Sequence, residues 1–263
     1  MIEALETPIT NRFMELVSQS NDNILLCSPF IKKDVVDQLL SAKPFDTQVD
    51  VITASNTLNY KRGSSDISAI KTLVDQGFDV RNYNNLHAKI YVFDDKKALV
   101  TSSNLTNGGF SRNFEYGLLI SEDKVLVQKI RHDFYVIFRD KNVGKYTKEN
   151  LSELEKIIPT LAQPVSCSPA DPAEDEIAHI DDYEDMVKEL PEWKRDVFGC
   201  LNKMKKDTFT LQDVYRASVP FLKKKWPNNH TVEASIRRNL EEIRNLGMIR
   251  FTDNQGTYKK LWK

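Results

Sequence analysis

The chain has 263 residues, of which 40% are hydrophobic and 29% are charged, and its formal net charge is −1. Domains usually contain about 100–200 residues, so this length allows one large hydrophobic core or two modest ones. No apolar run approaches the roughly 18 residues of a membrane span, and the first twenty residues lack the apolar centre of a signal peptide. The three cysteines form no C-x-x-C pair, which argues against a zinc ribbon and a disulfide framework. We therefore expect a soluble, cytoplasmic protein.

The charge is segregated along the chain. Residues 1–163 carry 20 Lys and Arg against 21 Asp and Glu, residues 164–192 carry 1 against 10, and residues 193–263 carry 16 against 7. A basic C-terminal segment is typical of nucleic-acid binding, although an ordinary solvated basic face has the same composition. Composition alone leaves both interpretations open.

Residues 1–158 alternate predicted strands with predicted helices. Buried apolar runs and period-two alternation predict the strands, whereas apolar spacing on one side predicts the helices. Strands that alternate with helices predict an α/β sandwich around a mostly buried sheet. The predicted strands are 23–27, 49–53, 78–83, 87–94, 97–103 and 114–120, and the predicted helices are 34–40, 64–77 and 124–139.

A linker is predicted over residues 159–191. Prolines recur from Pro159 to Pro172, and between Asp171 and Asp185 there are eight acidic residues and no basic one. This composition is typical of an exposed segment between two domains. The acidic stretch is either passive or a mimic of DNA that occupies a basic groove until substrate displaces it.

Residues 192–263 follow a different pattern. Three helices are predicted first, and two short strands joined by a turn follow them. We expect Pro220 to kink or end the second helix. Three helices followed by a hairpin is the order of a winged helix, a helix-turn-helix variant whose third helix usually enters the major groove. The predicted helices are 192–204, 210–226 and 232–247, and the predicted strands are 248–251 and 257–261.

Candidate DNA contacts lie at the start and on the polar side of the third helix. Asn can pair with adenine, and Arg with guanine, through two hydrogen bonds each. Helix capping explains Asn229 and Thr231 nearly as well. The candidates are Asn228, Asn229, His230, Thr231, Arg237 and Arg238.

The segment 86–120 concentrates the polar residues of a candidate active site. His87 and Lys89 are two apart on a predicted strand and so point to one face, while Asn104 and Glu115 lie in or beside the next two elements. An imidazole can attack phosphorus, and an ammonium and an amide can hold phosphoryl oxygens. A carboxylate can orient the imidazole. The set suits phosphoryl transfer, whereas an H-x-K pair alone is more often two exposed positions on a strand.

The motif H-x-K-x4-D, followed by T-S-S-N-L-T and N-x-E, resembles the signature of the phospholipase D superfamily, in its branch of Nuc-like and BfiI-like nucleases. The resemblance covers about residues 1–140 and implies an αβα sandwich with a mixed central sheet. It also implies chemistry without a metal ion or another cofactor, and no acidic cluster with metal-ligand spacing is present in the sequence. One departure is Thr101, which stands where the family usually has glycine.

This resemblance implies a role for each polar position of the motif. His87 is the expected nucleophile, and Lys89 and Asn104 are expected to bind the phosphate. Ser102 is expected to assist, and Glu115 to orient His87. The motif aspartate, Asp94, is more often structural in this family.

A single H-x-K motif is present, whereas members of the superfamily use two. One histidine attacks and the other protonates the leaving oxygen. The resemblance therefore implies a homodimer through the nuclease domain, with one active site at a two-fold interface and the second His87 as general acid.

The C-terminal segment resembles the winged-helix family of DpnI, a restriction endonuclease directed by adenine methylation. The likeness lies in F-T-L-Q-D-V-Y, I-R-R-N-L-E-E-I-R-N-L-G-M-I-R-F and G-T-Y-K-K-L-W. It implies a reader of double-stranded DNA that prefers N6-methyladenine in a short G-A-T-C-like site. No residue in the sequence identifies the apolar pocket that would bind the methyl group.

Together these patterns predict a nuclease domain over 1–158, an acidic linker over 159–191 and a winged helix over 192–263. The predicted activity is that of a homodimeric, metal-independent restriction endonuclease, which hydrolyses DNA phosphodiester bonds through a phosphohistidine at specific, methylated sites. An orthodox restriction enzyme blocked by methylation is one alternative. A non-catalytic DNA-binding regulator that dimerises through the nuclease fold is another. A phospholipase is disfavoured by the basic C-terminal domain and the lack of a membrane-binding segment.

Overall fold

The computed structural model describes residues 1–54, 57–160, 187–252 and 256–262. The chain falls into two compact units, one made of 1–55 with 63–148 and the other of 56–62 with 149–263. Within the described ranges, no helix is both long and apolar enough to cross a membrane. The acidic stretch between Asp171 and Asp185, and with it the DNA-mimic hypothesis, lies outside the described residues. The division at 158 and 191 stays a prediction.

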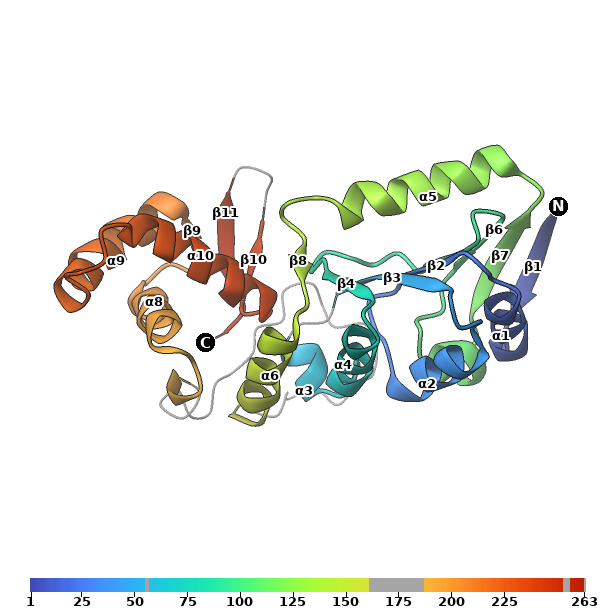
Figure 1. Ribbon diagram of the computed structural model, residues 1–263, viewed down its shortest axis with the longest axis horizontal. Coiled ribbons are helices and arrows are strands. Elements are labelled where there is room, and N and C mark those ends of the chain that lie inside the picture. The colour runs from blue at the N-terminus through green and yellow to red at the C-terminus, as the bar shows by residue number, and fades with distance from the viewer. Residues whose placement is uncertain (55–56, 161–186, 253–255, 263) are drawn as a thin grey trace. The chain divides into compact units, whose positions relative to one another are not determined.

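An eight-stranded mixed sheet forms the centre of the first unit (Figure 1). Its strand order is β1-β7-β6-β5-β2-β3-β4-β8, in which β2, β3 and β4 are parallel neighbours and the remaining pairs are antiparallel. The strands are β1 (Ile2–Glu6), β2 (Asn23–Cys27), β3 (Gln48–Thr53), β4 (Asp79–Asn82), β5 (Ile90–Phe93), β6 (Lys97–Thr101), β7 (Tyr116–Ser121) and β8 (Gly144–Lys145).

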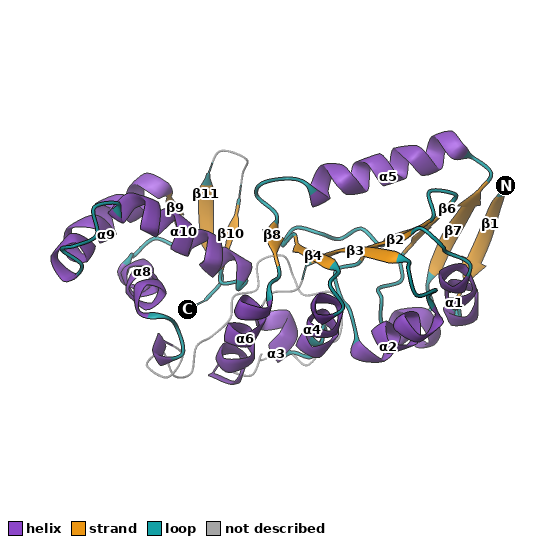
Figure 2. Cartoon of the chain, viewed as in Figure 1, coloured by secondary structure: helices purple, strands orange, loops and turns teal. Residues whose placement is uncertain are grey.

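Helices cover both faces of this sheet. Helix α5 lies on one face, and α1, α2 and α4 lie on the other (Figures 1 and 2). On the first face Phe134 of α5 shares a hydrophobic cluster with Val92 of β5, and on the second Phe13 of α1 packs edge-on against Tyr91. The predicted αβα sandwich with a mixed sheet is confirmed. The helices are α1 (Thr10–Ser18), α2 (Lys33–Ala42), α4 (Ile67–Asp75) and α5 (Lys124–Phe138).

The second unit contains the predicted winged helix. Its three helices pack on one another, and Phe198, Leu222, Ile236 and Leu240 are among the buried side chains. A three-stranded sheet of order β10-β11-β9 completes it, and β9 was not predicted. The elements are α8 (Glu192–Lys203), β9 (Thr208–Thr210), α9 (Leu211–Lys225), α10 (Val232–Asn245), β10 (Ile249–Phe251) and β11 (Thr257–Lys260).

Helix α9 runs through Pro220 without ending there, so that alternative of the sequence prediction was wrong. The helix begins with a capping box, in which Thr210 and Asp213 each satisfy a backbone N–H of the other. Buried Val214 and Leu222 anchor it on both sides of the proline. Packing and capping therefore outweigh the hydrogen bond that proline removes.

Helices α3 (Thr57–Lys61) and α6 (Lys148–Ile157) come from the N-terminal part of the sequence, but residues 56–62 and 149 onwards belong to the second unit. The hydroxyl of Thr57 lies 3.6 Å from the sulfur of Met248, within hydrogen-bond reach. Lys194 of α8 is 3% exposed and forms ion pairs with Glu153 of α6 and, at 3.0 Å, with Glu242 of α10. This unit is therefore assembled from two separate stretches of the chain, 56–62 and 149–263.

Candidate active site and nucleic-acid interface

The candidate catalytic residues come from neighbouring strands at one end of the first unit's sheet. In the order β7-β6-β5-β2, Thr101 lies opposite Gly117, Val100 opposite Ile90, and Ile90 opposite Cys27. These antiparallel registers bring the start of β5 and β7 beside the end of β6 and β2. Residues that directly precede or follow those strand ends therefore meet, and they include Lys89, Ser102, Glu115 and Ser28.

His87 and Lys89 both precede β5, because the strand begins at Ile90 and not at the expected position 87. Lys89 is only 7% exposed, whereas His87 is exposed. The expectation that His87 and Lys89 share one face of a strand is therefore wrong, because neither residue lies in the strand. The carbonyl of Lys89 accepts a hydrogen bond from the N–H of Thr101 at 3.1 Å, which ties this segment to the end of β6.

Cys27 lies beneath this segment, at the end of β2. Its thiol donates to the carbonyl of Ala88 at 3.7 Å. Burial raises the pKa of Cys27 to about 12, and the positive charge of Lys89 opposes this rise only in part. The thiol is therefore neutral at physiological pH.

Glu115 is held by three groups at the start of β7. The hydroxyl of Ser102 donates to one carboxylate oxygen, and the side-chain amide of Asn113 donates to the other at 3.2 Å. The N–H of Glu115 donates to the hydroxyl of Thr7 at 3.1 Å. Ser102 is fixed in turn, since its hydroxyl accepts the N–H of Tyr116 at 3.1 Å. The carboxylate therefore has one orientation at this end of the sheet.

Asn104 lies in the loop that follows β6, beside the turn that follows β2. Its side-chain carbonyl accepts the N–H of Phe30 at 3.4 Å and lies 3.5 Å from the hydroxyl of Ser28. The sequence predicted the buried strand 23–27 but gave no role to the turn Ser28-Pro29-Phe30 that follows it. The signal was its place directly after a buried strand, which is where site residues often lie.

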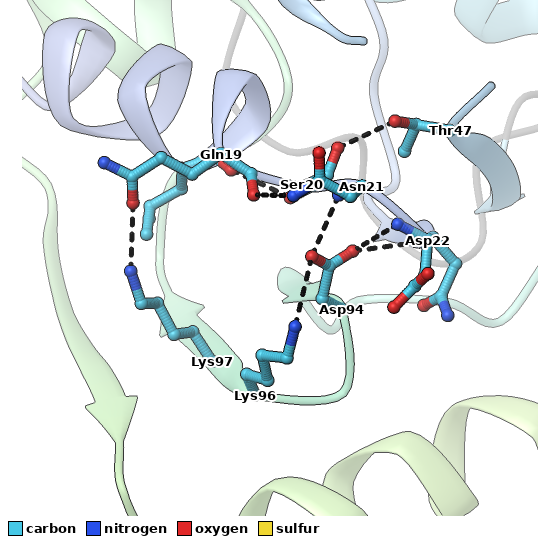
Figure 3. A network of polar contacts seen from close by, with 10 residues as sticks. Gln19, Ser20, Asn21, Asp22, Thr47, Asp94, Lys96 and Lys97 are labelled. Carbon is cyan, nitrogen blue, oxygen red and sulfur yellow. Dashed lines mark hydrogen bonds and ion pairs between the residues drawn. The ribbon is translucent and has the colours of Figure 1, made fainter. Parts of the chain in front are cut away.

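Asp94 lies at the other end of β5, away from the candidate site. Its carboxylate accepts backbone N–H groups of Asn21 at 2.9 Å, Asp22 at 2.8 Å and Asn23 at 3.2 Å, and it pairs with Lys96 at 3.8 Å (Figure 3). These contacts tie the β5–β6 turn to the start of β2. The position suits the structural role that the resemblance implied for this residue.

Asn229 makes its hydrogen bonds within the winged helix, at the start of α10. Its carbonyl oxygen accepts the N–H of Thr231 at 2.8 Å, and its NH2 group donates to Ser235 at 2.9 Å. These contacts form an Asx turn just before the helix, and they are not N-cap bonds to the N–H groups of its first turn. Thr231 is the N-cap residue but makes no capping hydrogen bond with its side chain.

The other DNA-binding candidates lie on the surface of the second unit. Asn228, His230 and Arg237 are exposed. Arg238 is exposed as well and pairs with Glu242 at 3.2 Å, one turn further along α10. An exposed pair of this kind contributes little to stability, so Arg238 is available to exchange its carboxylate partner for a phosphate.

Two family models match the chain, each over one of these regions. Residues 13–137 match the PLD-like domain described for cardiolipin synthase, and residues 189–260 match the Dam-replacing helix-turn-helix domain of DpnI. The chain joins a phospholipase D-like domain to a DpnI-type winged helix. Both sequence resemblances are thereby confirmed at the level of the domains.

Individual proteins resemble parts of this two-domain chain. It is 43% identical over 49 residues to the DISARM protein DrmC of Bacillus paralicheniformis, which is 19% of this chain and 20% of that protein. It is 25% identical over 117 residues to cardiolipin synthase 2 of Staphylococcus epidermidis, which is 43% of this chain and 24% of that protein. The matches thus span about a fifth to a quarter of these relatives.

Among solved structures, Nuc of Salmonella typhimurium, a phospholipase D family member, superposes with a TM-score of 0.49 and 18% identity. The superposition covers 56% of this chain and 99% of Nuc. NucT from Helicobacter pylori superposes with a TM-score of 0.43 and 17% identity, over 51% of this chain and 93% of that one.

Proposed function

We propose that the protein is an endonuclease that hydrolyses DNA phosphodiester bonds. The observation that supports the proposal is the placement of Lys89, Ser102 and Glu115 next to adjoining strand ends at one end of the sheet, within a phospholipase D-like domain. His87 precedes Lys89 in the same segment, and Asn104 lies in the loop that follows β6. An ammonium, an amide, a hydroxyl and an oriented carboxylate around one imidazole can serve transfer of a phosphoryl group. The attached winged helix supports DNA as the phosphodiester.

In the proposed first step, a ring nitrogen of neutral His87 attacks the phosphorus atom. A nitrogen–phosphorus bond forms while the bond from phosphorus to the leaving oxygen breaks, and a second histidine donates the proton that this oxygen takes. Lys89 and Asn104 hold the non-bridging oxygens, and the carboxylate of Glu115 stabilises the positive charge on His87. In the second step a water molecule loses a proton to the second histidine and displaces His87, which completes the hydrolysis.

The second histidine in this proposal is His87 of another copy of the chain. An apolar row on the sheet supports such a homodimer, because Ala4, Leu118 and Val100 lie opposite one another on β1, β7 and β6 and are all exposed. Leu118 is 43% exposed and Val100 is 39% exposed. Val100 lies two residues before Ser102, so a partner on this row would sit next to the candidate site.

Targeting is proposed to come from the winged helix. Residues 193–263 carry 16 Lys and Arg against 7 Asp and Glu, which favours binding to DNA phosphates. Arg237 and Arg238 on α10, with Asn228, His230 and Thr231 at its start, are the proposed contacts, whereas Asn229 holds the start of the helix. The match to the Dam-replacing domain supports N6-methyladenine as the mark that is read.

The test is incubation of the purified protein, in EDTA, with the same plasmid from adenine-methylating and non-methylating hosts. Cutting of the methylated plasmid alone is the expected result. Cutting of the unmethylated plasmid alone would favour an orthodox restriction enzyme, and a strict need for Mg²⁺ would contradict the metal-independent mechanism. No cutting under any condition would favour the DNA-binding regulator.

A pair of histidine variants tests the nucleophile. His87→Ala should abolish cutting and leave DNA binding unchanged, and a covalent protein–DNA adduct trapped by denaturing the reaction with detergent at alkaline pH should be lost with it. His132 is exposed on α5 and serves as the matched control, so His132→Ala should cut like the wild type. Residual cutting by His87→Ala above the background rate would assign the attack to another residue.

A further inference from the structure

The turn after β2 is bound to the loop that carries Asn104 by several hydrogen bonds. Ser28 is fully buried, and its hydroxyl donates to the carbonyl of Phe30 at 2.8 Å and accepts the N–H of Leu105 at 2.9 Å. The N–H of Lys32 donates to the carbonyl of Leu105 at 3.0 Å. Ser28 therefore joins two segments that are 77 residues apart in the sequence, at the residue next to Asn104.

These contacts determine which end of the Asn104 side chain is turned toward the protein. The carbonyl oxygen lies 3.4 Å from the N–H of Phe30 and 3.5 Å from the hydroxyl of Ser28. Exchanging the two ends of the amide would place its NH2 group against the N–H of Phe30, donor against donor. With the carbonyl held by the turn, the NH2 group is the end directed away from it. Phosphoryl oxygens only accept hydrogen bonds, so this is the end that can bind them.

The backbone of Asn104 is fixed from a second side by Gly109, in the π-helical segment Gly108–Arg112. A Cβ atom at position 109 would lie 2.6 Å from the carbonyl oxygen of Asn104 and 2.8 Å from its nitrogen. No side chain fits at that distance, so glycine allows the segment to pack directly on the Asn104 backbone. Asn104 is therefore held between a serine-anchored turn and a glycine contact.

We propose that Ser28 is a positioning residue that keeps the carbonyl of Asn104 on the turn and its NH2 group toward the phosphate. Ser28 does not touch the substrate in this proposal and acts through Asn104 alone. That the amide binds a phosphate rests on the proposed function, whereas the orientation of the amide rests on the N–H of Phe30, in the turn that Ser28 anchors. The two statements can be tested apart.

The experiment compares full-length Ser28→Ala with Ser20→Ala. Ser20 is a suitable control because it is also buried, and its hydroxyl donates to the carbonyl of Leu16 at 2.8 Å, at the end of the sheet where Asp94 lies. The first readout is the order parameter of the Asn104 side-chain NH2 group by NMR, with Asn104→Asp used to assign its signal. A rigid value of about 0.85 should fall below about 0.6 in Ser28→Ala and stay unchanged in Ser20→Ala.

The second readout is hydrolysis of bis(p-nitrophenyl) phosphate, which does not depend on the winged helix. Loss of one hydrogen-bond donor to a transition state lowers kcat by about 10²–10³-fold. A misoriented NH2 group of Asn104 should lose part of this contribution to kcat. Ser28→Ala should therefore lower kcat about tenfold, with a smaller change in KM. In an Asn104→Ala background, Ser28→Ala should change kcat by less than about twofold, because its effect passes through Asn104.

An unchanged order parameter of Asn104 in Ser28→Ala would overturn the proposal, and so would equal losses of kcat in Ser28→Ala and Ser20→Ala. A wild type that hydrolyses neither DNA nor the small phosphodiester would overturn the proposed nuclease, while the NMR readout would still decide the role of Ser28. If Ser28→Ala does not fold, Ser28→Cys keeps the size of the side chain, weakens its hydrogen bonds and replaces it in both readouts.

Discussion

Replacing Asp94 tests whether this carboxylate of the H-x-K-x4-D motif holds the fold or takes part in the chemistry. Asp94→Ala removes the acceptor of three backbone N–H groups, two of them at 2.9 and 2.8 Å. A hydrogen bond to a charged group contributes about 1.5–3 kcal/mol. The donors are partly exposed, so water replaces some of this, and we count only the two short bonds at the lower value. The free energy of unfolding should fall by about 3 kcal/mol.

The assay is urea unfolding followed by circular dichroism, with the phosphodiesterase rate measured on the fraction that stays folded. With a slope of about 2 kcal/mol per molar urea, the midpoint should fall by roughly 1.5 M while the rate per folded molecule stays close to wild type. Asp94→Asn keeps one strong acceptor and should lose less. A stability loss below about 0.5 kcal/mol together with a lost rate would refute the structural assignment.

Four further substitutions follow from the contacts described above. Gly117→Ala places a Cβ 2.7 Å from that of Thr101 and should cost about 1–3 kcal/mol in thermal unfolding, and Thr101→Gly in the same chain should restore most of it. Cys27 keeps its proton in the folded state up to a pKa of about 12, whereas unfolded chains lose it near 9. The free energy of unfolding of the wild type should therefore fall as the pH rises from about 9 to about 12. This fall should be steeper than in Cys27→Ala by up to about 1.4 kcal/mol per pH unit. Lys194→Ala leaves two carboxylates without their buried partner and should cost about 3 kcal/mol in urea unfolding. Arg237→Ala should weaken DNA binding and lower the salt dependence by about one unit of slope if it contacts a phosphate.

Each of these expectations has a contrary result. A double variant of 101 and 117 that is no more stable than Gly117→Ala would show that the two positions are not one steric pair. Equal pH slopes for wild type and Cys27→Ala, or wild-type unfolding of Lys194→Ala, would contradict the stated burial. Wild-type affinity of Arg237→Ala for every sequence tested would remove this residue from the interface.

The sequence predicted the central strands and the helices α2, α4, α5, α8, α9 and α10 because their hydrophobic periodicity is strong, but it missed α1 and α6. It missed β1, whose partner β7 lies more than a hundred residues away and whose exposed and half-buried positions carry a weak pattern. It also missed β8 and α3, which have two and five residues and too little periodicity to recognise. Short elements of this kind depend on tertiary contacts and not on local signal.

The sequence proposes the residues of the candidate site but not their arrangement. Glu115 was expected to orient His87, and the contact that fixes it with Ser102 follows from the β6–β7 register. In the sequence, Thr101 stands where the family usually has glycine. The structure instead has the small residue on the opposite strand, at Gly117, where a search along one motif does not look. The hydrogen bonds between the turn that contains Ser28 and the loop that carries Asn104 likewise join positions far apart in the sequence.

The position of helix α3 in the sequence limits how the two units can be separated or exchanged. It is encoded between β3 and α4 of the sheet domain, yet it is part of the unit that contains the winged helix, where Thr57 contacts Met248. The unit that contains the winged helix is therefore not a single continuous C-terminal segment. A chimaera that replaces only residues 192–263 would leave α3 and α6 against a foreign partner, so the second unit is exchanged intact only when residues 56–62 and 149–263 are replaced together.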